Sequence, residues 1–196
     1  MTTRRIGDGF LAIAALSLPG PAWAQHVVLM QQAAACDVTD MNSPPAVEWM
    51  RTYGWRYPSP ALARAGYLLL VNGQSPWPDW FTPAVSVLPP GTLFQVAIDA
   101  SQPDTNPGVF GTFDWIDSVG EVRDDLAVLQ AWMPDVQRVT TFRVTQPLPV
   151  LVGPIGPQVD PATCRLLPGR FSQFEMLVPA ANVMTYLAVV SSRPIE

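Results

Sequence analysis

The sequence predicts an α+β domain with a twisted, mostly antiparallel sheet and a helical N-terminal appendage. Two helix-like apolar stretches with their own start and stop residues occupy the first part of the chain. From Pro89-Pro90-Gly91 onward, short alternating segments bounded by turn residues predict strands, and one capped helix interrupts them. Helices followed by a run of strands are typical of the α+β class, and 196 residues suffice for one domain with a small subdomain.

Residues 1–24 have the pattern of a secretory signal peptide. Arg4 and Arg5 form a basic start, Phe10 to Leu18 is apolar, and Ala22-Trp23-Ala24 gives the small-x-small cleavage pattern. The apolar run is too short to cross a hydrocarbon core of roughly 30 Å. We therefore expect a mature chain that starts near Gln25, carries no membrane span, and is secreted or periplasmic.

The two cysteines of the chain, Cys36 and Cys164, predict one disulfide. Pairing is the usual state of cysteines in an exported protein. The alternative, a reactive thiol, needs a nearby histidine base, and the sole histidine is His26, at the edge of the mature chain. The bridge would tie the N-terminal segment to the last third of the fold.

Residues 25–87 predict the helical and loop-rich appendage. Ser43 is placed to cap a helix that begins at Pro44 and stops at Gly54. A second apolar stretch, Ala61 to Val71, ends at Asn72-Gly73, and the prolines that follow it prevent long regular structure.

Residues 88–196 predict the β-rich domain. Its first strand is Thr92 to Ile98, and a loop rich in Pro, Asp and Asn follows at residues 101–108. Ser118 and Glu121 form a capping-box pattern for a helix that continues through Trp132 and ends before Pro134. The remaining predicted strands are Arg138 to Thr145, Leu148 to Val152, Phe171 to Val178 and Val183 to Ser191.

Composition excludes several kinds of chemistry. All 11 basic residues are arginine, so a P-loop lysine or a Schiff-base lysine is absent, and one histidine makes a Ser-His-Asp triad or a histidine-rich metal site improbable. The acidic residues lack the spacing of a calcium loop, so no metal site is expected. A net charge of −5 and a pI of about 4.7 argue against nucleic acid as a partner.

The segment from Pro168 to Val178 carries the candidate catalytic residues. On a strand, Gln173 and Glu175 lie two apart and project from one face, directly after a glycine turn. A carboxylate there can stabilise the oxocarbenium character that develops when a ribosyl bond breaks, while its neighbour holds a ribose hydroxyl. The alternative is that both side chains only solvate an exposed sheet face.

A resemblance to a known family favours the catalytic interpretation. The run from Phe142 to Pro157, the later Leu167-Pro168-Gly169 and Gln173-Phe174, and the upstream Leu88 to Leu93 resemble the tuberculosis-necrotizing-toxin type of NAD glycohydrolase domain, in a divergent form. The resemblance implies an ADP-ribosyltransferase-like fold and a toxin-like enzyme that hydrolyses NAD, with NAD as substrate and no cofactor. It also implies an immunity or target protein as a partner.

The same resemblance assigns roles to individual residues. Gln173 occupies the position of the family's active-site glutamine, and Arg123 corresponds to a second family arginine. We expect Arg123 or Arg170 to bind the NAD pyrophosphate. The family's phosphate-binding arginine on the first strand has no counterpart in Phe94-Gln95-Val96-Ala97, and its histidine falls near Thr140.

Two other interpretations stay open. Gln173-Phe174-Glu175 also resembles the Gln/Glu-x-Glu strand of ADP-ribosyltransferase toxins, in which Glu175 would hold a ribose hydroxyl and Gln173 would help to select the acceptor. The third interpretation is a catalytically inactive, exported binding module of the same fold.

Overall fold

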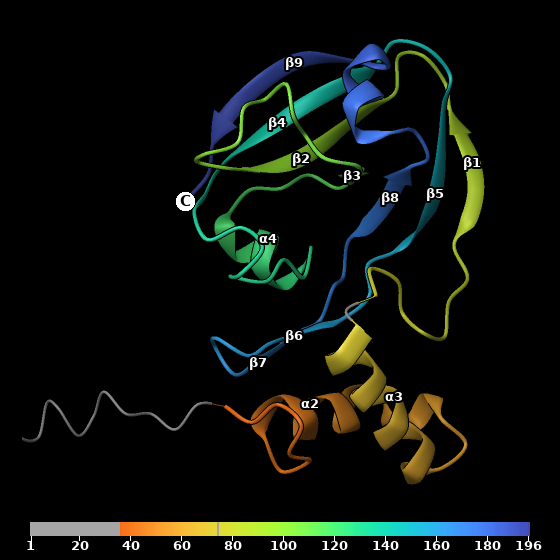
Figure 1. The fold of residues 1–196 in the computed structure, drawn as a ribbon, viewed down its shortest axis with the longest axis vertical. Helices are drawn as coiled ribbons and strands as arrows, with labels where there is room; N and C mark the ends of the chain where they lie inside the picture. Colours follow the sequence, from red (N-terminus) through yellow and green to blue (C-terminus); the bar gives the residue numbers. More distant parts are fainter. Residues whose placement is uncertain (1–35, 74) are drawn as a thin grey trace, which may run out of the picture. The chain divides into compact units, whose positions relative to one another are not determined.

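The structure is a computed structural model that describes residues 36–73 and 75–196, and these residues form one compact unit. The predicted signal peptide, residues 1–24, lies outside the described residues. Helices at the N-terminal end are followed by antiparallel strands, so the predicted α+β class is confirmed (Figure 1). Within the described residues, no helix has both the length and the apolar content that crossing a membrane requires.

The N-terminal part contains α2 (Pro44–Tyr53), the short 3-10 helix η1 (Gly54–Arg56) and α3 (Pro60–Gly73). Both predicted helices are confirmed, and α2 begins at the proline as expected. The predicted side-chain cap is wrong: Ser43 occupies the N-cap position, but its buried hydroxyl makes no capping hydrogen bond.

The remaining chain forms two main sheets. Sheet A has the order β1 (Ala84–Leu88), β5 (Leu148–Pro154), β8 (Ser172–Met176) and β3 (Phe110–Gly111), and sheet B has the order β2 (Leu93–Asp99), β4 (Val136–Val144) and β9 (Leu187–Pro194). A small hairpin pairs β6 (Gln158–Asp160) with β7 (Arg165–Leu167). Every strand pairing is antiparallel.

Two predicted elements differ from the structure. The capping box at Ser118 forms, but α4 (Val119–Asp124) ends well before Trp132, because the chain turns at Ala127 with a φ of 50°. Residues 125–134 instead form an irregular loop with short turns, in which Leu129 packs with Ala127, Ile155 and Leu167 in a small separate core. The last predicted strand also starts too early, since residues 180–185 form the 3-10 helix η2 and β9 begins at Leu187.

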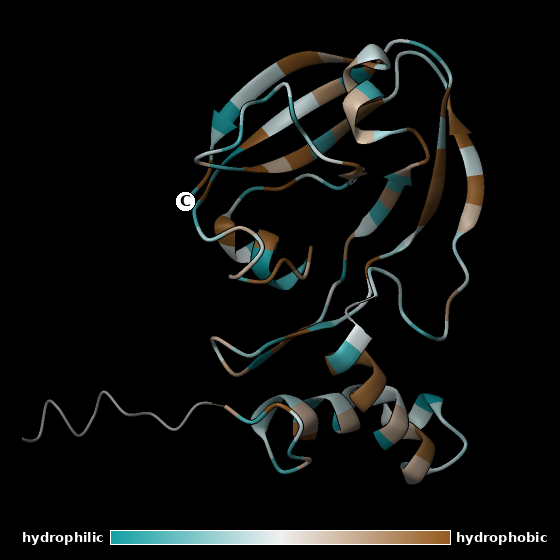
Figure 2. Ribbon diagram, viewed as in Figure 1, coloured by the Kyte–Doolittle hydropathy of each residue, from teal (hydrophilic) through white to brown (hydrophobic). Residues whose placement is uncertain are grey.

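The main core lies between sheets A and B. Phe94 of β2 is stacked on Phe142 of β4 and meets Phe174 of β8 edge to face, with ring centroids 5.6 and 4.9 Å apart. Hydrophobic residues make up much of β1 and β5 (Figure 2), and those that face inward, such as Leu88, Leu148 and Val150, join this core. Gly111 lies against the same rings, where a Cβ atom would approach Phe174 to 2.6 Å.

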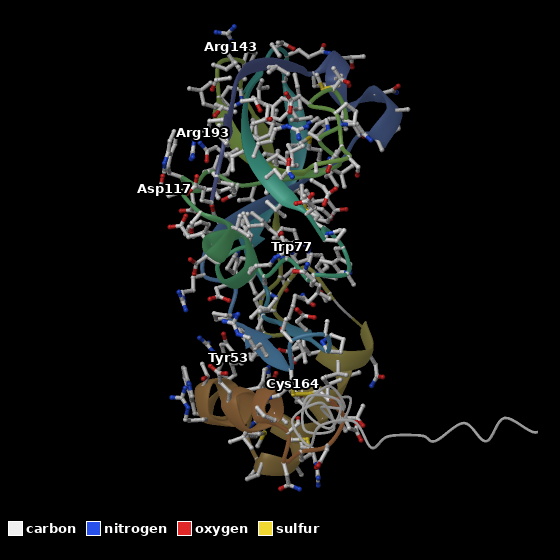
Figure 3. All side chains as sticks on the ribbon, turned by 90° about the vertical axis from the view of Figure 1, so that its left-hand side faces the viewer. Tyr53, Trp77, Asp117, Arg143, Cys164 and Arg193 are labelled. Carbon is white, nitrogen blue, oxygen red and sulfur yellow. A yellow bond between two sulfur atoms is a disulfide. The ribbon has the colours of Figure 1, made fainter. Side chains whose placement is uncertain are left out.

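A second core joins the helices to the β6–β7 hairpin. Trp49 and Tyr67 are buried there beside Val159 and Leu166 of the hairpin. The predicted disulfide between Cys36 and Cys164 is present and fixes the chain before α2 to the turn of this hairpin (Figure 3). The helical part is therefore attached to the β-rich part covalently as well as by packing.

Candidate functional site

A cavity of about 520 Å³ lies where the edge strands of the two sheets, β2 and β3, separate. This volume lies in the range of small-molecule sites. Its walls also include the loop after α4 and the segment that connects β5 to β6. The lining residues are Pro76, Gln95, Val96, Ala97, Gln102, Pro107, Gly108, Val109, Phe110, Gly111, Thr112, Leu126, Val128, Trp132, Met133, Ile155, Gly156, Gln158 and Gln173.

The separation of the two strands leaves backbone groups directed into the cavity. Gln95 and Thr112 exchange both backbone hydrogen bonds, at 2.9 and 3.0 Å, and form a single bridge between β2 and β3. Because hydrogen-bonding direction alternates along an antiparallel strand, Ala97 also directs its N–H and C=O away from β4. Ala97 lines the cavity and is 7% exposed, so a ligand finds a backbone donor beside a backbone acceptor there.

The structure places the predicted catalytic glutamine in this cavity. Gln173 lies on β8, is 9% exposed, and donates a hydrogen bond from Nε2 to the carbonyl oxygen of Pro76 at 2.6 Å. The backbone N–H of Gly156 donates to the same carbonyl at 2.9 Å. The amide nitrogen of Gln173 is thus engaged, which leaves the amide oxygen as the acceptor that the side chain offers to a ligand.

Glu175 lies near the cavity but not in its lining. Phe174 and Met176 point into the main core, so Glu175 is on the opposite face of β8, where the sequence also placed Gln173. Its direct neighbours across the sheet are Leu151 of β5 and Phe110 of β3, and Phe110 lines the cavity. Glu175, which is half-buried, therefore borders the rim of the cavity while Gln173 lies inside it.

Arg123 holds one wall of the cavity in place. Its guanidinium donates hydrogen bonds to the carbonyl oxygens of Val128, Leu129 and Met133, at 3.2, 3.1 and 2.5 Å. These bonds close the loop after α4, which supplies four of the lining residues including Trp132. The structure thus assigns Arg123 a supporting role, and its predicted contact with pyrophosphate stays a prediction.

Arg170 lies on the surface and not in the cavity lining. Its side chain is 65% exposed and forms an ion pair with Asp125 at 2.8 Å. None of the cavity-lining residues, within the part of the chain that the structure describes, has a charged side chain. Of the four predicted site residues, Gln173 lines the cavity, Glu175 borders it, and the two arginines lie outside it; their catalytic and binding roles stay predictions.

Asp99 joins two loops that form cavity walls. Its carboxylate accepts hydrogen bonds from the backbone N–H of Asp135 at 2.9 Å and from the N–H and hydroxyl of Ser101 at 3.1 and 2.9 Å. The backbone bond from Asp135, followed by those from Ser101, holds the pKa of Asp99 below its usual value. The sequence contained part of this signal, because Asp-x-Ser in a loop is a common turn pattern.

Two further buried glutamines fix the cavity walls. Gln95 accepts a hydrogen bond at Oε1 from the backbone N–H of Ile116 at 2.9 Å, and Gln158 donates from Nε2 to the carbonyl oxygen of Ser75 at 2.6 Å. Both side chains are less than 5% exposed. Sequence reasoning missed them, since each lies in an apolar segment with no motif around it.

The fold and the cavity together define an α+β protein with an uncharged ligand-sized pocket between two diverging sheets.

The sequence matches no protein-family model, and no curated protein matches it in sequence. Among solved structures it resembles Tne2, which was determined in complex with Tni2, at 21% identity and a TM-score of 0.50, covering 61% of this chain and 97% of that one. It also resembles Rhs1-CT, determined with its cognate immunity protein RhsI1, at 16% identity and a TM-score of 0.42, covering 59% of this chain and 82% of that one. The likeness to Tne2 shows a shared fold.

Proposed function

We propose that this protein is an NAD glycohydrolase, which cleaves NAD to nicotinamide and ADP-ribose. The observation that carries the proposal is Gln173, the residue at the position of the family's active-site glutamine, buried in a cavity of about 520 Å³. A ligand-sized cavity with a few convergent polar groups is the usual form of a small-molecule site.

The polar groups of the cavity suit a carboxamide. Ala97 offers an N–H donor and a C=O acceptor from one residue, and a carboxamide carries the complementary acceptor and donor. The nicotinamide ring of NAD is also cationic, and the lining within the described residues holds no guanidinium to repel it. We therefore place the nicotinamide ring beside β2, with its ribose toward Gln173.

The chemistry needs stabilisation of positive charge more than it needs a strong base. When the bond between the ribose carbon and the nicotinamide nitrogen breaks, its electron pair leaves with nicotinamide and the ribose acquires oxocarbenium character. Water then adds its oxygen to that carbon and releases one proton. Glu175 at the rim would stabilise the cationic ribose, and the Gln173 oxygen would accept a hydrogen bond from a ribose hydroxyl.

The diphosphate of NAD would lie outside the uncharged cavity. Arg170 is the exposed member of the two predicted phosphate ligands, and its partner Asp125 would have to share it. The Asp125 side chain is only 14% exposed, so Arg170 would keep this ion pair while its remaining N–H groups contact the phosphate.

We propose further that the protein is exported and toxin-like, with a dedicated protein partner. The signal-peptide pattern of residues 1–24 and the disulfide between Cys36 and Cys164 both fit an oxidising compartment. The fold shared with Tne2, which was determined with the partner Tni2, supports a partner for this chain as well.

A second candidate is ADP-ribosyl transfer to a protein, and the surroundings of Glu175 favour it. Glu175 lies in a cross-strand row with Val85, Leu151 and Phe110. Val85 is 77% exposed and Phe110 is 40% exposed, so this carboxylate borders an open apolar surface that an acceptor protein can reach. Mass spectrometry of candidate acceptors would detect transfer, whereas hydrolysis leaves them unmodified.

The deciding experiment measures nicotinamide release from NAD by the purified mature protein. We expect the wild type to release nicotinamide and Gln173→Leu to lose at least about 100-fold in kcat/KM, in line with losses of other charge-stabilising groups. Arg165→Met is a matched control, since Arg165 pairs with Asp124 on the surface and does not line the cavity. Intact NAD with the wild type alone would reject the glycohydrolase, and intact NAD in the presence of candidate acceptor proteins would also reject the transferase and leave the inactive binding module.

A further inference from the structure

We propose that Trp132 is the residue that binds the adenine ring of the substrate, by stacking at the mouth of the cavity. This inference rests on the proposed function for the identity of the ligand, and it adds a specificity-determining residue that neither the motif nor the resemblance contains. It starts from a tryptophan that lines the cavity and is nevertheless 48% exposed.

Trp132 both lines the cavity and remains 48% exposed. A tryptophan that served only the core would be covered, as Trp49 is at 1% exposure. The indole therefore keeps about half of its surface accessible to a ligand or to solvent while it forms part of the cavity wall. An accessible indole on the cavity wall can stack with the adenine ring of NAD while the nicotinamide ring occupies the interior of the cavity.

The loop that carries Trp132 is fixed before any ligand arrives. The backbone N–H of Trp132 donates to the carbonyl oxygen of Leu129 at 3.1 Å, and Arg123 binds the carbonyl oxygens of Leu129 and Met133 on either side of it. A stacking surface held this way loses little conformational entropy on binding. Tryptophan also has only two side-chain torsions to order.

The missing charges explain why a stacking residue is needed. The cavity-lining residues within the described chain include no arginine, and the chain has no lysine. Inside the cavity, affinity for a dinucleotide then comes from its rings and from hydrogen bonds, while the diphosphate lies outside the cavity near Arg170. Stacking of a base on an aromatic side chain contributes about 1–3 kcal/mol by alanine substitution, which converts to about 5- to 150-fold in affinity.

The choice of adenine follows from the two ends of the substrate. The proposed function puts the nicotinamide ring beside Ala97 and its ribose at Gln173, both of which are at least nine-tenths buried. The adenine lies at the other end of NAD, and the exposed part of the cavity is where that end would emerge. Trp132 is the largest aromatic side chain of the lining.

The first test is calorimetric titration of the full mature protein with AMP, using ribose 5-phosphate as the matched probe without the base. We expect Trp132→Ala to weaken AMP binding about 5- to 150-fold, Trp132→Phe to recover most of it, and ribose 5-phosphate to show no dependence on residue 132. Trp55→Ala is the control for loss of an indole, since Trp55 is 73% exposed and does not line the cavity. Equal AMP affinity in the wild type and Trp132→Ala, or no AMP binding by the wild type, would overturn the proposal.

The second test compares NAD with nicotinamide mononucleotide, which has the same scissile bond and no adenine. Trp132→Ala should raise KM for NAD about 5- to 150-fold and leave kcat and the mononucleotide values unchanged. An equal loss with both substrates would also overturn the stacking role. If neither substrate is cleaved, the proposed function fails, while the AMP titration still decides the role of Trp132.

Discussion

Replacing Arg123 tests whether this residue supports the cavity wall or binds substrate phosphate. In Arg123→Met, the carbonyl oxygens of Val128, Leu129 and Met133 lose their shared donor. A hydrogen bond to a charged group contributes about 1.5–3 kcal/mol. The three bonds share one guanidinium and one loop, so their effects do not add, and we expect a total loss of about 2–4 kcal/mol.

Urea denaturation of the disulfide-bonded protein measures this loss directly. Arg165→Met is the matched control, because it removes an arginine whose side chain is 54% exposed and paired only with Asp124. That control should lose less than about 1 kcal/mol. Hydrogen exchange should also quicken for residues 128–133 in Arg123→Met alone. If the two variants unfold at the same urea concentration and Arg123→Met only raises KM for NAD, Arg123 is a phosphate ligand and our account of the wall is wrong.

Three further predictions concern packing, cross-linking and pH. Gly111→Ala should lower the free energy of unfolding by about 1–3 kcal/mol, because the added Cβ atom would clash with the rings of Phe174 and Phe94. Gly73→Ala is the control, since a Cβ atom there has no neighbour within 4 Å and should not destabilise the protein. Thermal unfolding of the two variants measures the difference. Cys164→Ala should cost about 5 kcal/mol by chain entropy over a separation of 128 residues, measured by urea denaturation, and an unchanged midpoint would contradict this. Hydrogen bonds, first that from Asp135, lower the pKa of Asp99, so the stability it supplies is complete above about pH 4 and is lost as pH falls through the lowered pKa. The difference in unfolding free energy between wild type and Asp99→Asn should therefore shrink below about pH 4, and a constant difference would count against it.

Local signals in the sequence were sufficient for most of the fold. Pro44 marked the start of α2, the pair Ser118 and Glu121 marked α4, and the two cysteines gave the disulfide, because each depends on near neighbours or on simple counting. The end of α4 could not be predicted in this way. Leu126 to Trp132 keep a helix-like apolar spacing, but Arg123 binds the carbonyl oxygens of this segment in a non-helical loop.

The short strands and the cavity depend on contacts between distant segments. β3 has two residues and exists only through its pairing with β8, so no periodicity could reveal it. Gln173 was singled out by the resemblance, whereas Ala97 enters the proposed site through the direction of its backbone groups, which follows from the bridge between Gln95 and Thr112. A hydrogen-bond network of this kind appears only once the sheets are assembled.

We propose that the uncharged cavity beside Gln173 binds the nicotinamide end of NAD. This binding mode can be observed in a crystal structure of the protein with carba-NAD, in which a methylene group replaces the ribose ring oxygen and blocks cleavage. We expect the carboxamide on the backbone N–H and C=O of Ala97, the ribose within hydrogen-bonding distance of Gln173, and the adenine against Trp132. A nicotinamide ring bound outside the cavity, or a cavity that stays empty at saturating carba-NAD, would contradict it.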